Sequence, residues 1–162
     1  MLKYTISFIK RGNEILMLNR ESSPWTGMWN GVGGKVEKNE SAMDCILREI
    51  KEETGIEDAK VNYRGNVTWS KADGTNLGGM YVFIAELPET YEYNTPKSTE
   101  EGILDWKKIF WLLDEENVGV VGNIKYFLPK MLNESNTYNY RFVYQDMEII
   151  DVIIEPLEAF IT

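Results

Sequence analysis

Hydrophobic and β-branched residues gather in short runs separated by turn-forming residues, a pattern that predicts β-strands. The runs are 3–9, 14–18, 61–69, 80–87, 103–108, 138–144 and 148–154. The first two flank Arg11-Gly12-Asn13 and the last two flank Gln145-Asp146, so each pair predicts a β-hairpin. The chain therefore contains strands at both ends and in the middle.

One segment has clear helix signals at both of its ends. Ser41 is followed three residues later by Asp44, which is a capping signature, and Gly55 is a natural residue to end a helix after Thr54. These signals predict a helix over 42–54. Because strands outnumber helices and flank them, we expect an α+β fold with a mixed sheet covered by few helices.

The remaining segments read as loops or as broken helix. Residues 21–34 contain one Pro and four Gly and predict a long loop, and 88–99 predict another. Residues 114–132 are compatible with helix in parts, although Gly119, Gly122 and Pro129 limit it. The acidic run 114–116 is expected to be a solvated helix start.

Length and charge limit the classes of function. A chain of 162 residues predicts one domain spanning 1–162. Its 17 basic and 26 acidic residues give a net charge of −9, which disfavours polymeric nucleic acid and anionic membranes as partners. No run approaches 18 apolar residues and no signal peptide is evident, so we expect a cytoplasmic protein.

The residue types present also exclude several chemistries. The chain has no histidine, which removes histidine bases and histidine-ligated zinc. Its one cysteine, Cys45, excludes internal disulfides and is expected to be a small core residue. Catalysis must therefore rely on other groups.

Three glutamates share one arc of the predicted helix and overlap the edge of its apolar stripe. Glu49, Glu52 and Glu53 are related by three and four residues, and such like charges destabilise a helix unless a cation lies among them. Carboxylate oxygens suit Mg²⁺ or Mn²⁺ best. Arg48 lies four residues before Glu52 and is placed to clamp its carboxylate. The alternative is a solvated acidic helix face.

The stretch 34–56, GKVEKNESAMDCILREIKEETGI, resembles the signature of the Nudix hydrolases at every position. The resemblance implies an α/β/α sandwich around a mixed sheet and hydrolysis of a diphosphate linked to another moiety, with Mg²⁺ or Mn²⁺. It implies that Glu49, Glu52 and Glu53 are metal ligands, with Arg48 in the catalytic group. One of these glutamates, or one from a later loop, would act as general base. The signature also implies roles for the Gly33 carbonyl at the metal and for Lys35 at phosphate.

Features outside the signature resemble MutT-type oxidised-purine nucleoside triphosphate diphosphatases over nearly the whole chain. In that subgroup the Asn after Trp reads the purine, which points to Asn30, and a downstream Glu approaches the metal, which points to Glu101. Arg20 and Asn123 complete the expected substrate contacts. Some relatives have an acidic residue where this chain has Asn123 or Ile124, so base preference is open at this position.

Several single residues have both a structural and a functional interpretation. Trp25, Trp69 and Trp111 could each stack a base, although core or rim positions are more usual. Trp29 and Trp106 are expected to pack and to fix their neighbours. Glu100 is expected to be solvated.

We therefore expect a Mg²⁺-dependent or Mn²⁺-dependent enzyme that cleaves purine nucleoside triphosphates, preferably oxidised ones such as 8-oxo-dGTP, as a monomer or homodimer. Alternatives are hydrolysis of RNA 5′-triphosphate ends or of another nucleoside diphosphate derivative. A nucleotide sensor without turnover would usually have lost a signature glutamate, and none is lost here. Calcium buffering is disfavoured because no loop has EF-hand spacing.

Overall fold

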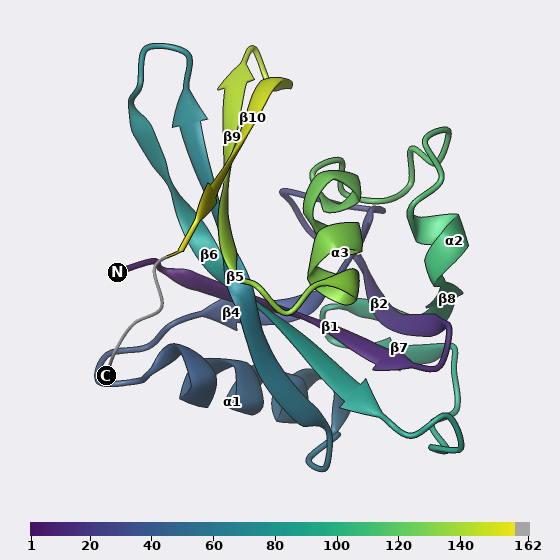
Figure 1. Ribbon diagram of the computed structural model, residues 1–162. Helices are drawn as coiled ribbons and strands as arrows, with labels where there is room; N and C mark the ends of the chain where they lie inside the picture. Colours follow the sequence, from purple (N-terminus) through teal and green to yellow (C-terminus); the bar gives the residue numbers. More distant parts are fainter. Residues whose placement is uncertain (158–162) are drawn as a thin grey trace.

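The computed structural model describes residues 1–157, which form one ten-stranded mixed β-sheet with three helices (Figure 1). The strands are β1 (Tyr4–Arg11), β2 (Glu14–Arg20), β3 (Trp29–Asn30), β4 (Val32–Lys35), β5 (Lys60–Lys71), β6 (Asn76–Leu87), β7 (Lys97–Thr99), β8 (Gly102–Lys108), β9 (Tyr138–Gln145) and β10 (Glu148–Pro156). The helices are α1 (Ala42–Thr54), α2 (Ile109–Leu112) and α3 (Ile124–Asn133).

Strand order places the amino-terminal hairpin in the middle of the sheet. The order is β10-β9-β5-β6-β1-β2-β8-β7, with β3 added to β2 and β4 added to β1. The β1–β6 and β5–β9 pairs are parallel and the other pairs are antiparallel. The expected mixed sheet of an α+β fold is thus confirmed.

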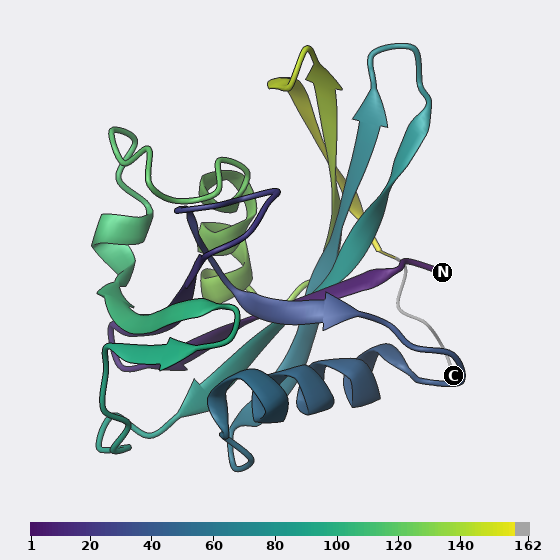
Figure 2. The same ribbon diagram turned by 180° about the vertical axis from the view of Figure 1, so that it is seen from behind.

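Helices cover the two faces of the sheet, so that α1 and α3 lie on opposite sides of it (Figures 1 and 2). On one face, Ile46 and Ile50 of α1 pack with Phe83 and other apolar residues. On the other face, Phe127 of α3 contacts Phe8 of β1, with ring centroids 5.8 Å apart. The two cores give the layered α/β/α arrangement that the signature implied.

Two long hairpins extend beyond the layered body. The β5–β6 and β9–β10 hairpins project to the same side, away from α1 (Figure 1). Because β5 and β9 are paired in parallel, with Trp69 opposite Phe142, the tips of the two hairpins lie beside each other.

The predicted loops contain more regular structure than the sequence indicated. The expected loop 21–34 includes β3 and most of β4, and 88–99 includes all of β7. Strands β5 and β6 extend past the predicted 61–69 and 80–87 into a long hairpin. In each case the extra residues are held by hydrogen bonds to a neighbouring strand that local sequence does not reveal.

The predicted helix start at 114–116 is wrong. These residues are exposed, but they form a turn in which the Glu116 amide donates to Asp114 Oδ1 at 2.9 Å. The helix in this region starts at Ile124 and contains Pro129. Among residues 1–157, no helix combines the length and the apolar character needed to cross a membrane.

Candidate active site

Helix α1 is fixed at both ends and along its buried side. The Ser41 hydroxyl accepts a hydrogen bond from the Asp44 amide at 3.0 Å, and Gly55 ends the helix with φ of 80°. Ile46 and Ile50 are buried against the sheet. These contacts confirm the predicted bounds and hold the opposite edge of the helix, with its glutamates, beside β4.

Two glycines bring β4 close to its neighbours. A Cβ atom at Gly33 would collide with the Thr5 carbonyl oxygen of β1, and one at Gly34 would collide with the Glu49 carboxylate. A side chain at Gly33 would separate β4 from β1, and a side chain at Gly34 would displace the Glu49 carboxylate. Their absence leaves backbone groups of the strand directly beside the acidic edge of the helix.

Arg48 donates hydrogen bonds to three carboxylates and one carbonyl. Its guanidinium donates to Glu40 Oε2 at 2.7 Å, to Glu49 Oε1 at 2.9 Å, to Glu52 Oε2 at 3.3 Å and to the Lys35 carbonyl at 3.2 Å. The hydrogen bonds from Arg48 lower the pKa of Glu40 to about 2. The predicted clamp on Glu52 is confirmed, and Glu40 and Glu49 are added to it. Glu40 fills a signature position, which was the only sequence sign of this role.

Glu53 is a carboxylate that has been partly removed from water without a compensating partner. Its Oε2 atom is buried and makes no hydrogen bond within the described residues. Burial, and after it the neighbouring Glu101, raises the pKa of Glu53 to about 10. Burial also raises the pKa of Glu49, against the opposing effect of Arg48, and the charge of Glu101 adds to it. Glu49, Glu53 and Glu101 therefore form a cluster of acids that repel one another.

The acidic cluster fits a divalent cation in its chemistry, although its side chains are not arranged around one. Within residues 1–157, no group of three or more acidic, histidine or cysteine side chains is positioned to hold a metal ion. Glu49 and Glu52 turn towards Arg48 instead. The unpaired Glu53 oxygen and the oxygen-only donors nevertheless match what Mg²⁺ and Mn²⁺ prefer.

The raised pKa of Glu53 predicts that Glu53→Gln stabilises the metal-free protein near neutral pH. With a pKa of about 10 the buried carboxyl must bind a proton on folding, which costs stability above the ordinary glutamate pKa, and a neutral amide avoids that cost, so we expect the free energy of unfolding to rise by about 1–3 kcal/mol. Urea unfolding in the presence of a chelator measures this change in the free energy of unfolding. The control Glu57→Gln changes an exposed acid paired with Lys51 and should shift stability by less than about 0.5 kcal/mol. A less stable Glu53→Gln protein would contradict this account of Glu53.

The predicted substrate residues meet in one cavity of about 410 Å³, called the inner pocket here. Its lining includes Arg20, Asn30, Gly33, Lys35 and Asn123, and it contains no acidic residue. The structure thus brings together groups that lie more than 100 positions apart in the sequence. Two basic side chains without an acid favour an anionic ligand.

Two amides of the inner pocket present opposite hydrogen-bonding groups. Asn30 Oδ1 accepts from the Gly31 amide at 2.9 Å, which leaves the Asn30 NH₂ group as donor for a ligand. Asn123 is only 6% exposed, and its Oδ1 has no partner within the described residues. The pocket therefore offers a donor from one amide and an acceptor from the other.

Some of the tryptophans line the inner pocket, and others pack against the core. Trp25 and Trp69 line the inner pocket, whereas Trp111 does not and instead lies near the Lys107 ammonium group. Trp29 packs on the core beneath α3. Trp106 is buried and donates to the Tyr93 carbonyl at 3.0 Å. The predicted packing roles of Trp29 and Trp106 are confirmed.

The two remaining single-residue predictions are also confirmed. Cys45 is fully buried in the core, and Glu100 is exposed. Glu101, its neighbour, is exposed as well, but its charge acts on Glu49 and Glu53. Of these two acids, the structure therefore places Glu101 at the acidic cluster, as expected.

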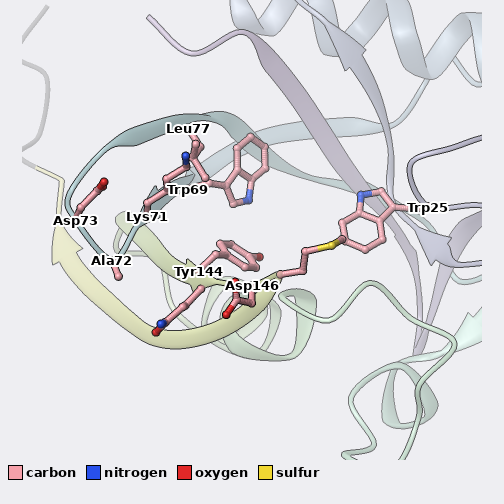
Figure 3. Close-up of a pocket in the computed structure, with 10 residues that line it drawn as sticks. Trp25, Trp69, Lys71, Ala72, Asp73, Leu77, Tyr144 and Asp146 are labelled. Carbon is pink, nitrogen blue, oxygen red and sulfur yellow. The ribbon is translucent and has the colours of Figure 1, made fainter.

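The structure contains a second cavity, called the outer pocket here, that no sequence pattern predicted. It has a volume of about 730 Å³ and lies between the tips of the two projecting hairpins (Figure 3). Trp25 and Trp69 border both pockets, and Leu77 and Tyr144 line the outer one alone. No sequence pattern indicated it, because its walls come from three separate segments.

Comparison with known proteins identifies one domain family and relatives along nearly the whole chain. The family described as NUDIX domain matches residues 2–132. The uncharacterized Nudix hydrolase YvcI of Bacillus subtilis is 24% identical and aligns over 95% of this chain and 94% of its own length. The oxidized purine nucleoside triphosphate hydrolase of Mus musculus is also 24% identical, over 91% of this chain and 89% of its own.

Solved structures show the same fold. A MutT protein from Bacillus halodurans superimposes with a TM-score of 0.74 at 24% identity, covering 95% of this chain and 97% of that one. A MutT Nudix hydrolase from Burkholderia pseudomallei gives a TM-score of 0.60 at 24% identity, covering 79% and 95%. The matched family region includes α1, the acidic cluster and the inner pocket as far as Asn123.

Proposed function

This chain belongs to the Nudix hydrolase family, and from that premise we propose that it cleaves purine nucleoside triphosphates, preferably oxidised ones such as 8-oxo-dGTP. The products would be the nucleoside monophosphate and pyrophosphate. Its general chemistry, as a Nudix enzyme, is pyrophosphohydrolysis of acid anhydrides. The proposal adds the base and the position of cleavage.

The observation that carries the proposal is the pair of amides in the inner pocket. Asn30 offers a donor and Asn123 a buried acceptor, and a purine edge carries both kinds of group. An ordinary purine has an acceptor at N7, whereas oxidation at C8 places a hydrogen there. An acceptor such as Asn123 Oδ1 pairs with that N–H and repels the lone pair of an ordinary purine. The name of the mouse relative agrees with this preference.

The phosphates are assigned to the basic end of the inner pocket. Lys35 and Arg20 are its two cationic residues, and the backbone at Gly33 and Gly34 lies close to the acidic edge of α1. The family typically uses a divalent metal. We assign Mg²⁺ or Mn²⁺ to the carboxylates of Glu49, Glu52, Glu53 and Glu101 and to the Gly33 carbonyl.

Each group then has a distinct task in hydrolysis. A bound divalent ion supplies charge neutralisation and a more acidic water molecule. Arg48 positions Glu49 and Glu52 through the hydrogen bonds already described. A glutamate of the acidic cluster takes the proton of the attacking water as general base. Lys35 and Arg20 hold the phosphate chain while Asn30 and Asn123 orient the base.

A nucleotide panel tests the proposal. We expect kcat/KM for 8-oxo-dGTP to exceed that for dGTP by at least about tenfold, because one correctly paired base edge discriminates by about 1–3 kcal/mol. The panel includes triphosphate-ended RNA. Equal rates for the two nucleotides, or faster turnover of RNA, would overturn the assignment.

Replacing the buried acceptor tests its role directly. Asn123→Leu keeps the approximate volume and removes the oxygen, so we expect the preference for 8-oxo-dGTP over dGTP to fall about tenfold. The comparison of kcat/KM for both nucleotides measures it. As a control, Asn139→Leu removes an amide that contacts Thr68 outside the inner pocket, and it should leave the preference unchanged.

A further inference from the structure

We propose that Lys107 is a positioning residue for base recognition. Its ammonium group restrains Trp29, and Trp29 in turn fixes the two segments that carry Asn30 and Asn123. This inference rests on the proposed function, in which these two amides read the base. Lys107 lines neither the inner nor the outer pocket, so it acts on the ligand only through Trp29.

The Lys107 ammonium group lies over two indole rings. Lys107 Nζ is 4.3 Å from the ring centroid of Trp29 and 5.3 Å from that of Trp111. It is also 3.4 Å from Oδ2 of Asp105, and the Lys107 side chain is only 25% exposed. Tryptophan attracts a cation more strongly than the other aromatic residues do, and the attraction increases when the cation is shielded from water. The ammonium group therefore restrains the Trp29 ring.

The backbone of Trp29 joins the segments of the two base-reading amides. Its amide donates to the Gly119 carbonyl at 2.8 Å, and its carbonyl accepts from the Val121 amide at 3.1 Å. Asn30 directly follows Trp29 in the chain. Asn123 lies two residues after Val121. A shift of Trp29 would therefore change the spacing between the donor on one segment and the acceptor on the other.

The second indole, that of Trp111, belongs to a residue of the same network. The Trp111 carbonyl accepts a hydrogen bond from Asn117 Nδ2 at 2.8 Å. Asn117 Oδ1 in turn accepts from the Gly119 amide at 3.0 Å. The ammonium group thus lies over the rings of two residues whose backbones both hold the loop 117–121.

The backbone link at Trp29 is short, so a restraint on its side chain adds to it. Strand β3 has two residues, and Trp29 meets Val120 in an isolated bridge instead of a ladder. A hydrogen bond weakens steeply when its donor and acceptor move out of alignment. Because the acidic cluster lies elsewhere, on α1 and at Glu101, loss of the restraint should affect base discrimination more than hydrolysis itself.

Lys107→Met tests the inference through the preference for 8-oxo-dGTP over dGTP. Methionine keeps an aliphatic side chain and removes the charge. We expect the ratio of the two kcat/KM values to fall about fivefold, mainly through a higher KM for 8-oxo-dGTP, while kcat stays within about twofold of that of the unmodified protein. Lys107→Arg keeps a cation that stacks on indole rings, and it should retain the ratio within about twofold.

A matched control uses Lys97 of β7, whose Nζ is 5.0 Å from the ring centroid of Tyr93 and which lines neither pocket. Lys97→Met makes the same chemical change and should leave the ratio unchanged. The positioning role is overturned if Lys107→Met keeps the ratio, if it lowers kcat for both nucleotides at constant ratio, or if Lys107→Arg or Lys97→Met loses as much preference. Each of these results leaves the proposed function standing.

Amide hydrogen exchange separates the two proposals if the unmodified protein shows no turnover or no preference. In that case the proposed function fails, and the exchange rates of the Trp29 and Val121 amides, measured by NMR, decide whether Lys107 restrains Trp29. The restraint stands if Lys107→Met raises both rates about fivefold while Lys107→Arg and Lys97→Met leave them unchanged. Any other pattern of rates overturns it.

Discussion

Glu52→Gln is expected to reduce kcat at least about a hundredfold while leaving the fold intact. We assign the Glu52 carboxylate to the metal, and a neutral amide neutralises less of the cation's charge and binds it more weakly; a loss of this size corresponds to about 2.7 kcal/mol of transition-state stabilisation. The side chain is 59% exposed, and its bond to Arg48 at 3.3 Å is one of several that Arg48 makes. The structural cost should therefore stay below about 1 kcal/mol.

Turnover of 8-oxo-dGTP at saturating Mg²⁺ measures the effect, and circular dichroism checks the fold. Glu57→Gln is the matched control, because Glu57 is an equally exposed acid that pairs with Lys51 away from the acidic cluster. It should retain full activity. An unchanged rate in Glu52→Gln would remove Glu52 from the metal site, even if the enzyme is otherwise active.

Phe127→Ala is expected to have the largest effect on stability, lowering the free energy of unfolding by about 3–5 kcal/mol. Phe127 is fully buried, and its ring lies 5.8 Å from Phe8, 6.2 Å from Tyr140 and 6.4 Å from Phe142, measured between centroids. Its removal leaves a cavity between α3 and the sheet. Because Asn123 directly precedes α3, the loss should also loosen the base site.

Urea unfolding curves for the metal-free protein measure this change. Phe110→Ala is the control, since Phe110 is 76% exposed on α2 and should cost less than about 0.5 kcal/mol. Phe127→Leu, which keeps most of the volume, should recover the greater part of the lost stability. A Phe127→Ala protein destabilised by less than about 1 kcal/mol would show that α3 is not held by this core.

The active-site helix was predictable because its signals are local. Ser41 and Gly55 act on backbone groups within four residues of themselves, and the structure shows both contacts. The hairpins were predictable for the same reason, since each depends on a short turn between two apolar runs. Local hydrogen bonding is what a single sequence encodes most directly.

Features that depend on distant partners were not predictable. Strand β4 consists of Val32, two glycines and Lys35, a composition that indicates a loop, and it becomes a strand because β1 offers a free row of backbone groups. The acidic run 114–116 has a composition typical of the start of a helix. The Asp114 side chain instead accepts a hydrogen bond from the Glu116 amide and closes a turn. In both cases a specific partner overrides local preference.

In the candidate site, too, the features that depend on local sequence were predicted and those that depend on distant partners were not. The glutamates and Arg48 were found because they lie on one helix, and Asn30 and Lys35 were assigned through the resemblance of their motifs to those of the family. Tyr144 was missed because it approaches Asn123 only through the parallel pairing of β5 with β9. The outer pocket was missed because β6, β9 and the loop at Trp25 meet only in the folded sheet.

The two parallel strand pairs also constrain synthesis of this protein. Strand β1 leaves the ribosome first, but its partner β6 is complete only at Leu87, and β5 must wait for β9, which ends at Gln145. Helix α1 emerges after β1, β2 and β4, whose apolar residues share its core, but before Phe83 of β6 can complete that core. The apolar side of α1 is therefore only partly covered until β6 has been translated, and the sheet is complete only when β9 joins β5.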